Sequence, residues 1–305
     1  MRRYVCLIID IEKSKKYSID NRNQIQFYMD KYIRSLNMLF SKEFQCEVMF
    51  SAGDEVQGLF DNVISALLYF RLLEMLMHPV AIRAGIGIGE WTIKMEPRMS
   101  TKQDGPAYHN ARRAIEEVHD RQLQNIRIYS EEDDDILLNN LINASLVLKQ
   151  QQIYMQNIVQ VLVELIFPFI PKYANVDYYG EVRQLIEIKF EYKLGAKNIK
   201  TYSKRNWDKE KFLQFEAIPD IVPIYINGII DDRESAIIKR NTANIISRIL
   251  QCSRQNVDSI IRRGNINKIR ELDYVALQYV EKIYGGLTTI FKITKEKYLE
   301  DFTGD

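Results

Sequence analysis

Two aspartates stand where predicted strands end, and together they could hold metal ions. Asp10 closes an apolar run at 3–11, and Asp54 lies in the stretch SAGDEVQG, between two short strand-like runs. Carboxylate oxygens suit Mg²⁺ or Mn²⁺, which keep several waters and take their remaining ligands from substrate phosphates. In two-metal chemistry, ions about 3.5–4 Å apart stabilise the attacking and the leaving oxygens.

Glu55 is a candidate third metal ligand, although strict strand alternation would turn it to the face opposite Asp54. A structural alternative is open for each aspartate, because Asp10 can cap a turn and Asp54 can serve a Gly-Asp hairpin. Either aspartate alone fits that alternative better. The case for a metal site rests on their joint position and on the sequence around them.

Hydrophobic periodicity predicts the elements that must position these aspartates. A glycine at the centre of Ala52, Gly53 and Asp54 indicates a tight hairpin turn, and Pro106 opens a helix. The expected strands are 3–11, 45–51, 55–60, 80–90 and 126–130, and the expected helices are 21–42, 61–77 and 106–118.

This β-α-β-β-α-β order, followed by another helix and strand, predicts an α+β, ferredoxin-like fold, in which an antiparallel sheet carries helices on one face. The central hairpin then brings residue 54 beside the end of the first strand. The acidic run at 131–135 is interpreted as a solvated helix start rather than a metal site. We predict three regions: an α+β domain at 1–130, a helical linker region at 131–235, and a helix-turn-helix domain at 236–305.

The composition excludes several classes of protein. A net charge of +1 gives no overall field for nucleic acid or an anionic membrane, so such binding must be local. Three cysteines without a CxxC pair argue against a disulfide framework or a structural zinc. The apolar stretch 157–170 is shorter than the ~20 residues of a spanning helix, and Glu164 interrupts it. We expect a cytoplasmic protein with no membrane contact.

The segment DGPAYHNARRA predicts a helix whose first amides and two arginines favour an anion such as phosphate. An ordinary amphipathic helix is the alternative. Before it, Gly85, Gly87 and Gly89 alternate along a strand, so a ligand or a closely packed helix could approach the bare face. His78 and His119 have no partner in the sequence and are expected to be structural.

Four segments carry a family resemblance: LIIDIEKS, FSAGDEVQGLF, IRAGIGIGE and DGPAYHNARRAIEE. In order and spacing they resemble the SatD family of bacterial proteins, over residues 1–120. More distantly, they resemble the catalytic domain of class III adenylyl and guanylyl cyclases, and GDE at 53–55 resembles part of the GGDEF signature. The resemblance implies a nucleotide-cyclase-type palm in which Asp10 and Asp54 hold metals. It also implies a triphosphate near the loop formed by Ile11, Glu12, Lys13 and Ser14.

The cyclase pattern matches this chain only in part. Cyclases place an asparagine and an arginine four residues apart on the helix after their glycine-rich strand, where this chain has His109 and Arg113. Arg113, with Arg112 beside it, could stabilise charge on a transferring phosphate. Phe50 replaces the lysine that reads the purine, so no base preference follows. Ala52 departs from the GGDEF string, so cyclic di-GMP synthesis is not expected.

The stretch TANIISRILQCSRQNVDSIIRRG, from residue 242, predicts a helix-turn-helix, as the ends of SatD proteins also do. Gln251 replaces the usual glycine of the turn. A small helical bundle for dimerisation is the alternative. The residues expected to reach DNA bases are Arg254, Gln255 and Asn256, and those expected to meet phosphates are Arg262 and Arg263.

Three functions remain open from the sequence. The first is a metal-dependent nucleoside-triphosphate-binding protein, acting as a nucleotidyl cyclase or nucleotidyltransferase and coupled to double-stranded DNA. Because such cyclases build their site across a homodimer, Arg113 is expected to act on the partner's substrate. The second is an inactive nucleotide-sensing regulator, suggested by Phe50 and His109. The third is a structural interaction protein.

Overall fold

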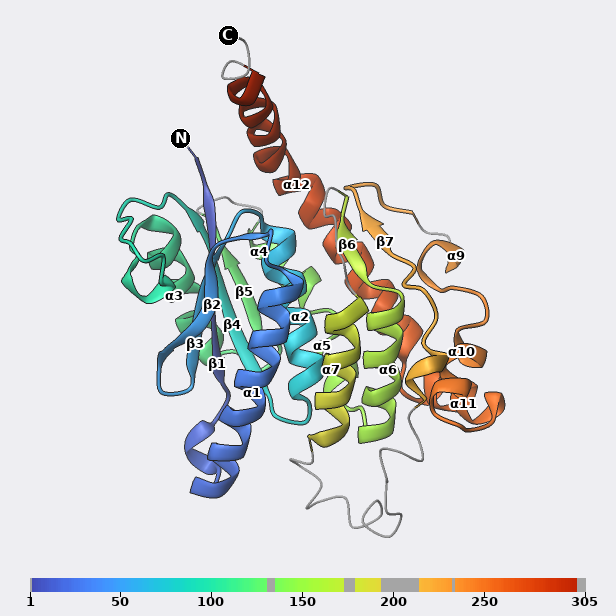
Figure 1. Ribbon diagram of the computed structural model, residues 1–305. Coiled ribbons are helices and arrows are strands. Elements are labelled where there is room, and N and C mark those ends of the chain that lie inside the picture. The colour runs from blue at the N-terminus through green and yellow to red at the C-terminus, as the bar shows by residue number, and fades with distance from the viewer. Residues whose placement is uncertain (1, 131–134, 173–178, 193–213, 232–233, 301–305) are drawn as a thin grey trace.

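The computed structural model describes residues 2–130, 135–172, 179–192, 214–231 and 234–300. These residues form a mixed α/β fold around a five-stranded sheet of order β2-β3-β1-β4-β5 (Figure 1). The strands are β1 (Tyr4–Ile11), β2 (Phe44–Ala52), β3 (Glu55–Phe60), β4 (Ile82–Gly89) and β5 (Ile126–Tyr129). The helices packed on them are α1 (Ile19–Leu39), α2 (Val63–Met77) and α3 (Pro106–His119).

The central strand β1 pairs antiparallel with both β3 and β4. Strand β5 pairs parallel with β4, so the sheet is mixed, whereas the sequence predicted an antiparallel one. The reason is the crossover through α3, which returns the chain to the edge of the sheet in the direction of β4. The predicted order of strands and helices up to β5 is observed, with boundaries shifted by a few residues.

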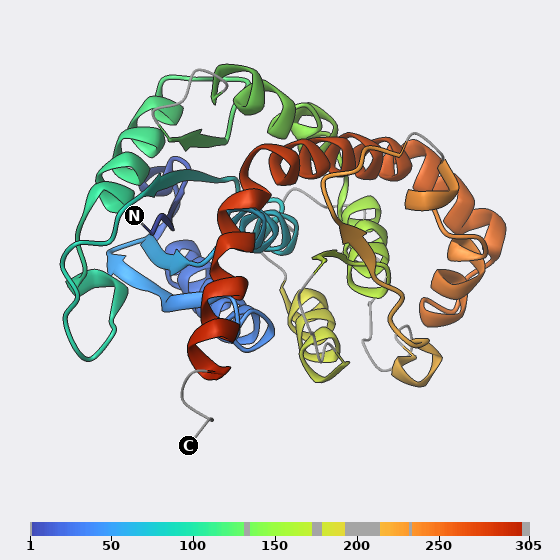
Figure 2. The same cartoon turned by 90° about the horizontal axis from the view of Figure 1, so that it is seen from above.

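Both faces of the sheet are covered, because side chains of β1 alternate between two cores. Leu7 and Ile9 pack with residues of α1 and α2, while Cys6 and Ile8 pack with residues of α3. Figure 2 shows α1 and α2 on one side of the sheet and α3 on the other. The expectation that helices cover one face therefore holds for α1 and α2 and is wrong for α3.

The glycine row of β4 lets α3 lie directly on the sheet. A Cβ atom at Gly87 would lie 2.1 Å from the backbone oxygen of Ala107, and one at Gly85 would lie 2.3 Å from that of Ala111. Distances this short are steric clashes, so only glycine fits at this spacing. Of the two explanations left open by the sequence, close helix packing is the one observed.

Helices dominate the rest of the described chain, and a small parallel sheet pairs β6 (Phe169–Pro171) with β7 (Ile224–Ile226). The helices are α4 (Asp135–Ile142), α5 (Leu146–Gln150), α6 (Tyr154–Ile166), α7 (Tyr179–Glu191), α9 (Glu234–Ile237), α10 (Thr242–Ile249), α11 (Arg254–Arg263) and α12 (Ile266–Glu300). Of the acidic run, 131–134 lies outside the described residues and Asp135 begins α4. Across the described part of the chain, no helix has the length and apolar character needed to cross a membrane.

A buried ion network joins α2 to the later helices. The guanidinium of Arg71 on α2 donates two hydrogen bonds to Glu164 of α6, at 2.7 and 2.6 Å, and one to Asp273 of α12, at 2.6 Å. Arg270 of α12 also pairs with Glu164, at 2.6 Å, and all four residues are at most 6% exposed. Breaking a buried pair leaves an uncompensated charge, so the network fixes α12 against α2.

We expect Gly87→Val to lower the free energy of unfolding by about 3 kcal/mol or more, because its side chain would overlap the backbone of α3. Urea unfolding measures the effect. The matched control is Gly180→Ala in α7, where an added Cβ has no atom within 4 Å and should be neutral or stabilising by up to about 1 kcal/mol. Equal stability of the two variants would show that α3 does not rest on β4 in this way.

Candidate functional site

Asp10 is the second-to-last residue of β1 and lies on the face of the sheet that carries α3. In the sheet register it is opposite Arg83 of β4, whose Nε and Nη2 donate hydrogen bonds of 3.2 and 2.9 Å to its Oδ2. His119 at the end of α3 places Nε2 3.5 Å from the same oxygen. Because all these contacts use Oδ2, the Oδ1 atom of Asp10 forms no hydrogen bond with any described residue.

Asp54 belongs to the turn between β2 and β3 and is partly buried. Among the described residues, its side chain takes part in no hydrogen bond or ion pair. Burial raises the pKa of Asp10, and the charge of Asp54 adds to the rise, while the hydrogen bond from Arg83 opposes it. The charge of Asp54 therefore acts on Asp10 at this end of the sheet.

Glu55 lies on the same face as Asp10 but is already paired. Since Ile9 is opposite Val56, Glu55 stands opposite Asp10. Its oxygens accept hydrogen bonds from Arg112 of α3, at 2.5 and 2.8 Å, and from Ser51, at 2.8 Å. Burial alone would raise the pKa of Glu55, but these hydrogen bonds outweigh it and lower the pKa. The alternation argument does not apply to Asp54, because Asp54 sits in the turn, outside the strand.

Of the three carboxylates predicted as metal ligands, two keep oxygens that no described residue binds. Asp10 Oδ1 and the whole carboxylate of Asp54 are available, and hard cations prefer such oxygens. Both oxygens of Glu55 are occupied by Arg112, and the described residues include no group of three or more His, Cys, Asp or Glu side chains that could hold a metal. Water and substrate phosphates would have to supply the other ligands.

The segment from Ile11 to Ser14, predicted to contact a triphosphate, presents backbone groups to a ligand more than side chains. Ile11 is 2% exposed and belongs to the core, so only its backbone can face a ligand. Glu12 and Lys13 form an ion pair, and Lys13 has a left-handed backbone with φ 54°. The carbonyl oxygen of Ser14 accepts a hydrogen bond of 3.3 Å from Arg22 of α1. The loop is therefore held against α1, with the side chain of Lys13 exposed.

His109 and Arg113 lie on the outer surface of α3 and form no contact with the two aspartates. The His109 ring is 3.4 Å from Asp104, and its side chain is 73% exposed. The guanidinium of Arg113 stacks 4.2 Å from the ring centre of Tyr129 and lies 3.3 Å from Glu117. Within one chain, α3 therefore brings Arg112 to Glu55 and leaves Arg113 turned outward.

Arg83 and His119 were not identified from the sequence as site residues, and His119 was expected to be structural. The signal for Arg83 was the antiparallel register of β4 against β1, which places it opposite Asp10. Hydrophobic patterns predict both strands but not how they are aligned. His119 meets Asp10 because α3 runs the length of β4, which again is a tertiary fact.

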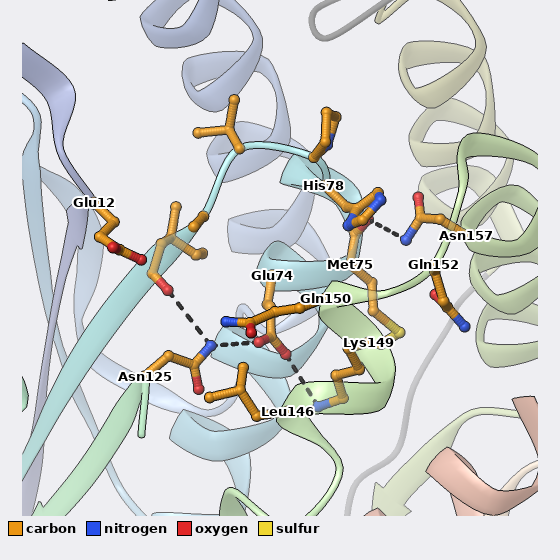
Figure 3. Close-up of a pocket in the computed structure, with 14 residues that line it drawn as sticks. Glu12, Glu74, Met75, His78, Asn125, Leu146, Lys149, Gln150, Gln152 and Asn157 are labelled. Carbon is orange, nitrogen blue, oxygen red and sulfur yellow. Dashed lines mark hydrogen bonds and ion pairs between the residues drawn. The ribbon is translucent and has the colours of Figure 1, made fainter. Parts of the chain in front are cut away.

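A cavity of about 250 Å³ opens beyond the same end of the sheet, between α2, α5 and α6 (Figure 3). Glu12 stands at one side of it, and His78 and Asn157 stand at the other. Burial lowers the pKa of His78 to about 4, and the charge of Lys189 adds to the effect. The histidine is therefore neutral at pH 7.

A separate polar surface lies on α11, which follows α10 after a short turn. Gln251 in that turn has φ 48°, the left-handed conformation that glycine usually supplies. The hydroxyl of Ser253 accepts a hydrogen bond of 3.2 Å from the amide of Asn256 and so caps α11. All five residues predicted to meet DNA are exposed: Arg254, Gln255, Asn256, Arg262 and Arg263.

Comparison with known proteins gives a strong family match and weaker structural ones. The model of the SatD family matches residues 4–211. No curated protein matches the chain in sequence. Two matching solved structures both carry the description of a bacterial light-regulated adenylyl cyclase. One is 16% identical over 42% of this chain and 75% of that chain, with a TM-score of 0.30, and the other is 15% identical over 42% of each chain, also with a TM-score of 0.30. At these scores the likeness says nothing about activity.

We expect His78→Asn to reduce the loss in free energy of unfolding that the wild-type protein shows as the pH falls from 7.5 to 5.0. The folded state keeps His78 neutral down to a pKa of about 4, whereas the unfolded chain protonates it near 6.5. Its contribution is therefore complete above pH 6.5 and is lost as the pH falls towards 4, by up to about 3 kcal/mol. Urea unfolding at pH 7.5 and 5.0 measures the slope. The exposed His109→Asn should retain the wild-type slope, and an unchanged slope in His78→Asn would contradict the assignment.

Proposed function

The chain belongs to the SatD family, and we propose that it is a metal-dependent nucleoside-triphosphate-binding protein coupled to a DNA-binding helix-turn-helix. The proposed chemistry is that of a nucleotidyl cyclase or nucleotidyltransferase, in which a ribose 3′-hydroxyl attacks an α-phosphate and pyrophosphate leaves. The observation that carries the proposal is the pair of carboxylates at one end of the sheet, Asp10 at the end of β1 and Asp54 in the adjacent turn.

Each residue of this site has a distinct part in the proposal. Asp10 and Asp54 would hold Mg²⁺ or Mn²⁺, which when bound would neutralise phosphate charge. Arg83 fixes Oδ2 of Asp10 and so presents Oδ1 to a cation. Arg112, through its pair with Glu55, sets the distance between α3 and the hairpin. The backbone from Ile11 to Ser14 is the proposed contact for the triphosphate.

The strand order supports the finer assignment of the domain as a ferredoxin-like, cyclase-type palm. Strand β3 lies between β1 and β2, and β4 flanks β1 on the other side, as a β-α-β-β-α-β domain with both helices on one face requires. The outward position of Arg113 agrees with a site completed across a homodimer, in which Arg113 and His109 serve the partner's substrate. We propose that residues 1–130 form the palm, residues 131–235 the linker region and residues 236–305 the helix-turn-helix domain.

We expect Asp54→Asn to weaken Mn²⁺ binding at least tenfold in the presence of a nucleoside triphosphate, because it removes a charged ligand without changing volume. Calorimetric titration measures the affinity. Asp30→Asn on the outer side of α1 is the control and should bind as the wild type does. If Asp54→Asn bound Mn²⁺ as tightly as the wild type does, the proposed metal site would be wrong.

Turnover separates the enzyme from the inactive sensor, which is favoured by Phe50 and His109 at positions where cyclases read the substrate. The protein is incubated with Mn²⁺ and each of the four nucleoside triphosphates, and pyrophosphate is measured. Release that is lost in Asp54→Asn supports the enzyme. Metal-dependent nucleotide binding without pyrophosphate supports the sensor, and no binding leaves the structural alternative.

We expect the double variant Arg254→Glu and Arg262→Glu to lose affinity for double-stranded DNA and to reduce its salt dependence. Each removed phosphate contact should lower the slope of log K against log salt by about 1. Fluorescence anisotropy at several salt concentrations gives that slope. Lys42→Glu, an exposed charge reversal near the end of α1, is the control. If the double variant binds DNA like the wild type, α11 is not the DNA-binding surface.

A further inference from the structure

A second cavity, of about 190 Å³, lies at the end of the sheet where β1 begins, and we call it the Tyr4 cavity. Its walls come from the starts of β1 and β2 and from the loop between β4 and α3, which Figure 1 shows beside α3. Its lining includes Arg2, Tyr4, Trp91, Lys94, Glu96 and Arg98. Tyr4 and Asp10 stand near opposite ends of β1, about 20 Å apart at about 3.3 Å per residue. The Tyr4 cavity is therefore separate from the proposed triphosphate site.

Two buried aromatic rings hold cations at this cavity. The ring centres of Tyr4 and Trp91 are 5.4 Å apart in an edge-to-face arrangement, and these residues are 5% and 6% exposed. Lys94 Nζ lies 4.8 Å from the ring centre of Trp91 and 5.6 Å from that of Tyr4. Arg98 Cζ is 6.0 Å from the Trp91 ring, and Arg2 Cζ is 4.6 Å from the Tyr4 ring. Because aromatic faces attract cations, the two rings gather three positive charges around one cavity.

Two of these cations keep hydrogen-bond donors that the protein does not use. Lys94 forms no hydrogen bond or ion pair with any described residue. Arg98 pairs with Glu96 through Nε at 3.1 Å, which leaves both of its Nη groups without an acceptor among the described residues. Arg2 is already paired with Asp61, at 2.9 Å. The side chains of Lys94 and Arg98 are exposed, so a ligand from solvent can reach their free donors.

The loop that carries these two cations is organised around one buried glutamine. Gln103 is 6% exposed, and its Nε2 donates to the carbonyl oxygens of Met95 and Met99, at 2.8 and 3.0 Å. Its Oε1 accepts hydrogen bonds from the amide of Met95, at 3.0 Å, and from Trp91 Nε1, at 3.2 Å. The loop backbone is thus fixed in advance, and a preorganised site loses less conformational entropy when a ligand binds.

A phosphate monoester matches these donors better than a carboxylate does. At pH 7 it carries about 1.5 to 2 negative charges and presents three acceptor oxygens. A guanidinium fork can bind two of these oxygens and a lysine ammonium the third, whereas a carboxylate has one charge and two oxygens. Since the net charge of the chain is only +1, no extended positive field favours a polyanion, and the local cations suit one phosphate group.

We propose that the Tyr4 cavity binds the phosphate group of a small phosphate monoester. Lys94 Nζ and the two Nη groups of Arg98 donate hydrogen bonds to its terminal oxygens, and the rings of Tyr4 and Trp91 keep these cations in place. This site goes beyond the proposed function, because it lies at the other end of β1 from Asp10 and needs no metal ion.

Saturation-transfer NMR titrations of the full chain with three sugars, in buffer with EDTA and without inorganic phosphate, test the proposal. Glucose 6-phosphate should bind. Glucose should not bind, and glucuronate, which carries a carboxylate on the same ring, should bind about tenfold more weakly or less. The double variant Lys94→Gln and Arg98→Gln should weaken binding of glucose 6-phosphate by about tenfold or more, because it removes the charged donors.

Two further variants are controls for this experiment. Lys102→Gln should bind glucose 6-phosphate as the wild type does, since Lys102 is exposed in the same loop but does not line the cavity. Asp54→Asn should also leave this binding unchanged, because the metal site is at the other end of the sheet.

The other outcomes count against the site. Absence of glucose 6-phosphate binding at millimolar concentration overturns the proposal, and so does equal affinity for glucuronate. Equal binding by the double variant and the wild type, or an equal loss in Lys102→Gln, would show that the Tyr4 cavity is not the site. Binding that is lost in Asp54→Asn and kept in the double variant would place the phosphate at the triphosphate site instead.

Discussion

The direct contact between α3 and the glycine row of β4 sets the geometry of the candidate site. With side chains at Gly85 and Gly87, the helix would be pushed away from the sheet. Arg112 could not then reach Glu55, and His119 could not lie beside Asp10. The spacing between helix and sheet is thus a condition for the electrostatic arrangement at the end of β1.

In that arrangement, arginines neutralise the three carboxylates to different degrees. Glu55 is neutralised by Arg112 through both of its oxygens, whereas Asp10 is held by Arg83 through one oxygen only. Asp54 is left without a protein partner among the described residues, and its charge adds to the effect of burial in raising the pKa of Asp10. The proposed metal site rests on this imbalance, because a divalent cation would neutralise the carboxylate oxygens that the arginines leave free.

The helical region is tied to the palm by buried charges as well as by apolar packing. Arg71, Glu164, Arg270 and Asp273 connect α2 to α6 and α12, and α12 begins directly after α11. Because removing any one member would leave a buried charge unpaired, these helices are held in one arrangement.

The sequence by itself determined the local features of this protein. Alternation and helical spacing located β1, the hairpin and α3, and so placed Asp10 and Asp54 at strand ends, because these patterns depend on neighbouring residues only. The tertiary structure decided the partners, such as Arg83 and His119 at Asp10. Glu164, which in sequence only interrupts an apolar stretch, became the centre of an ion network. Such pairings join residues far apart in the chain, and no local pattern encodes strand register or which buried charges meet.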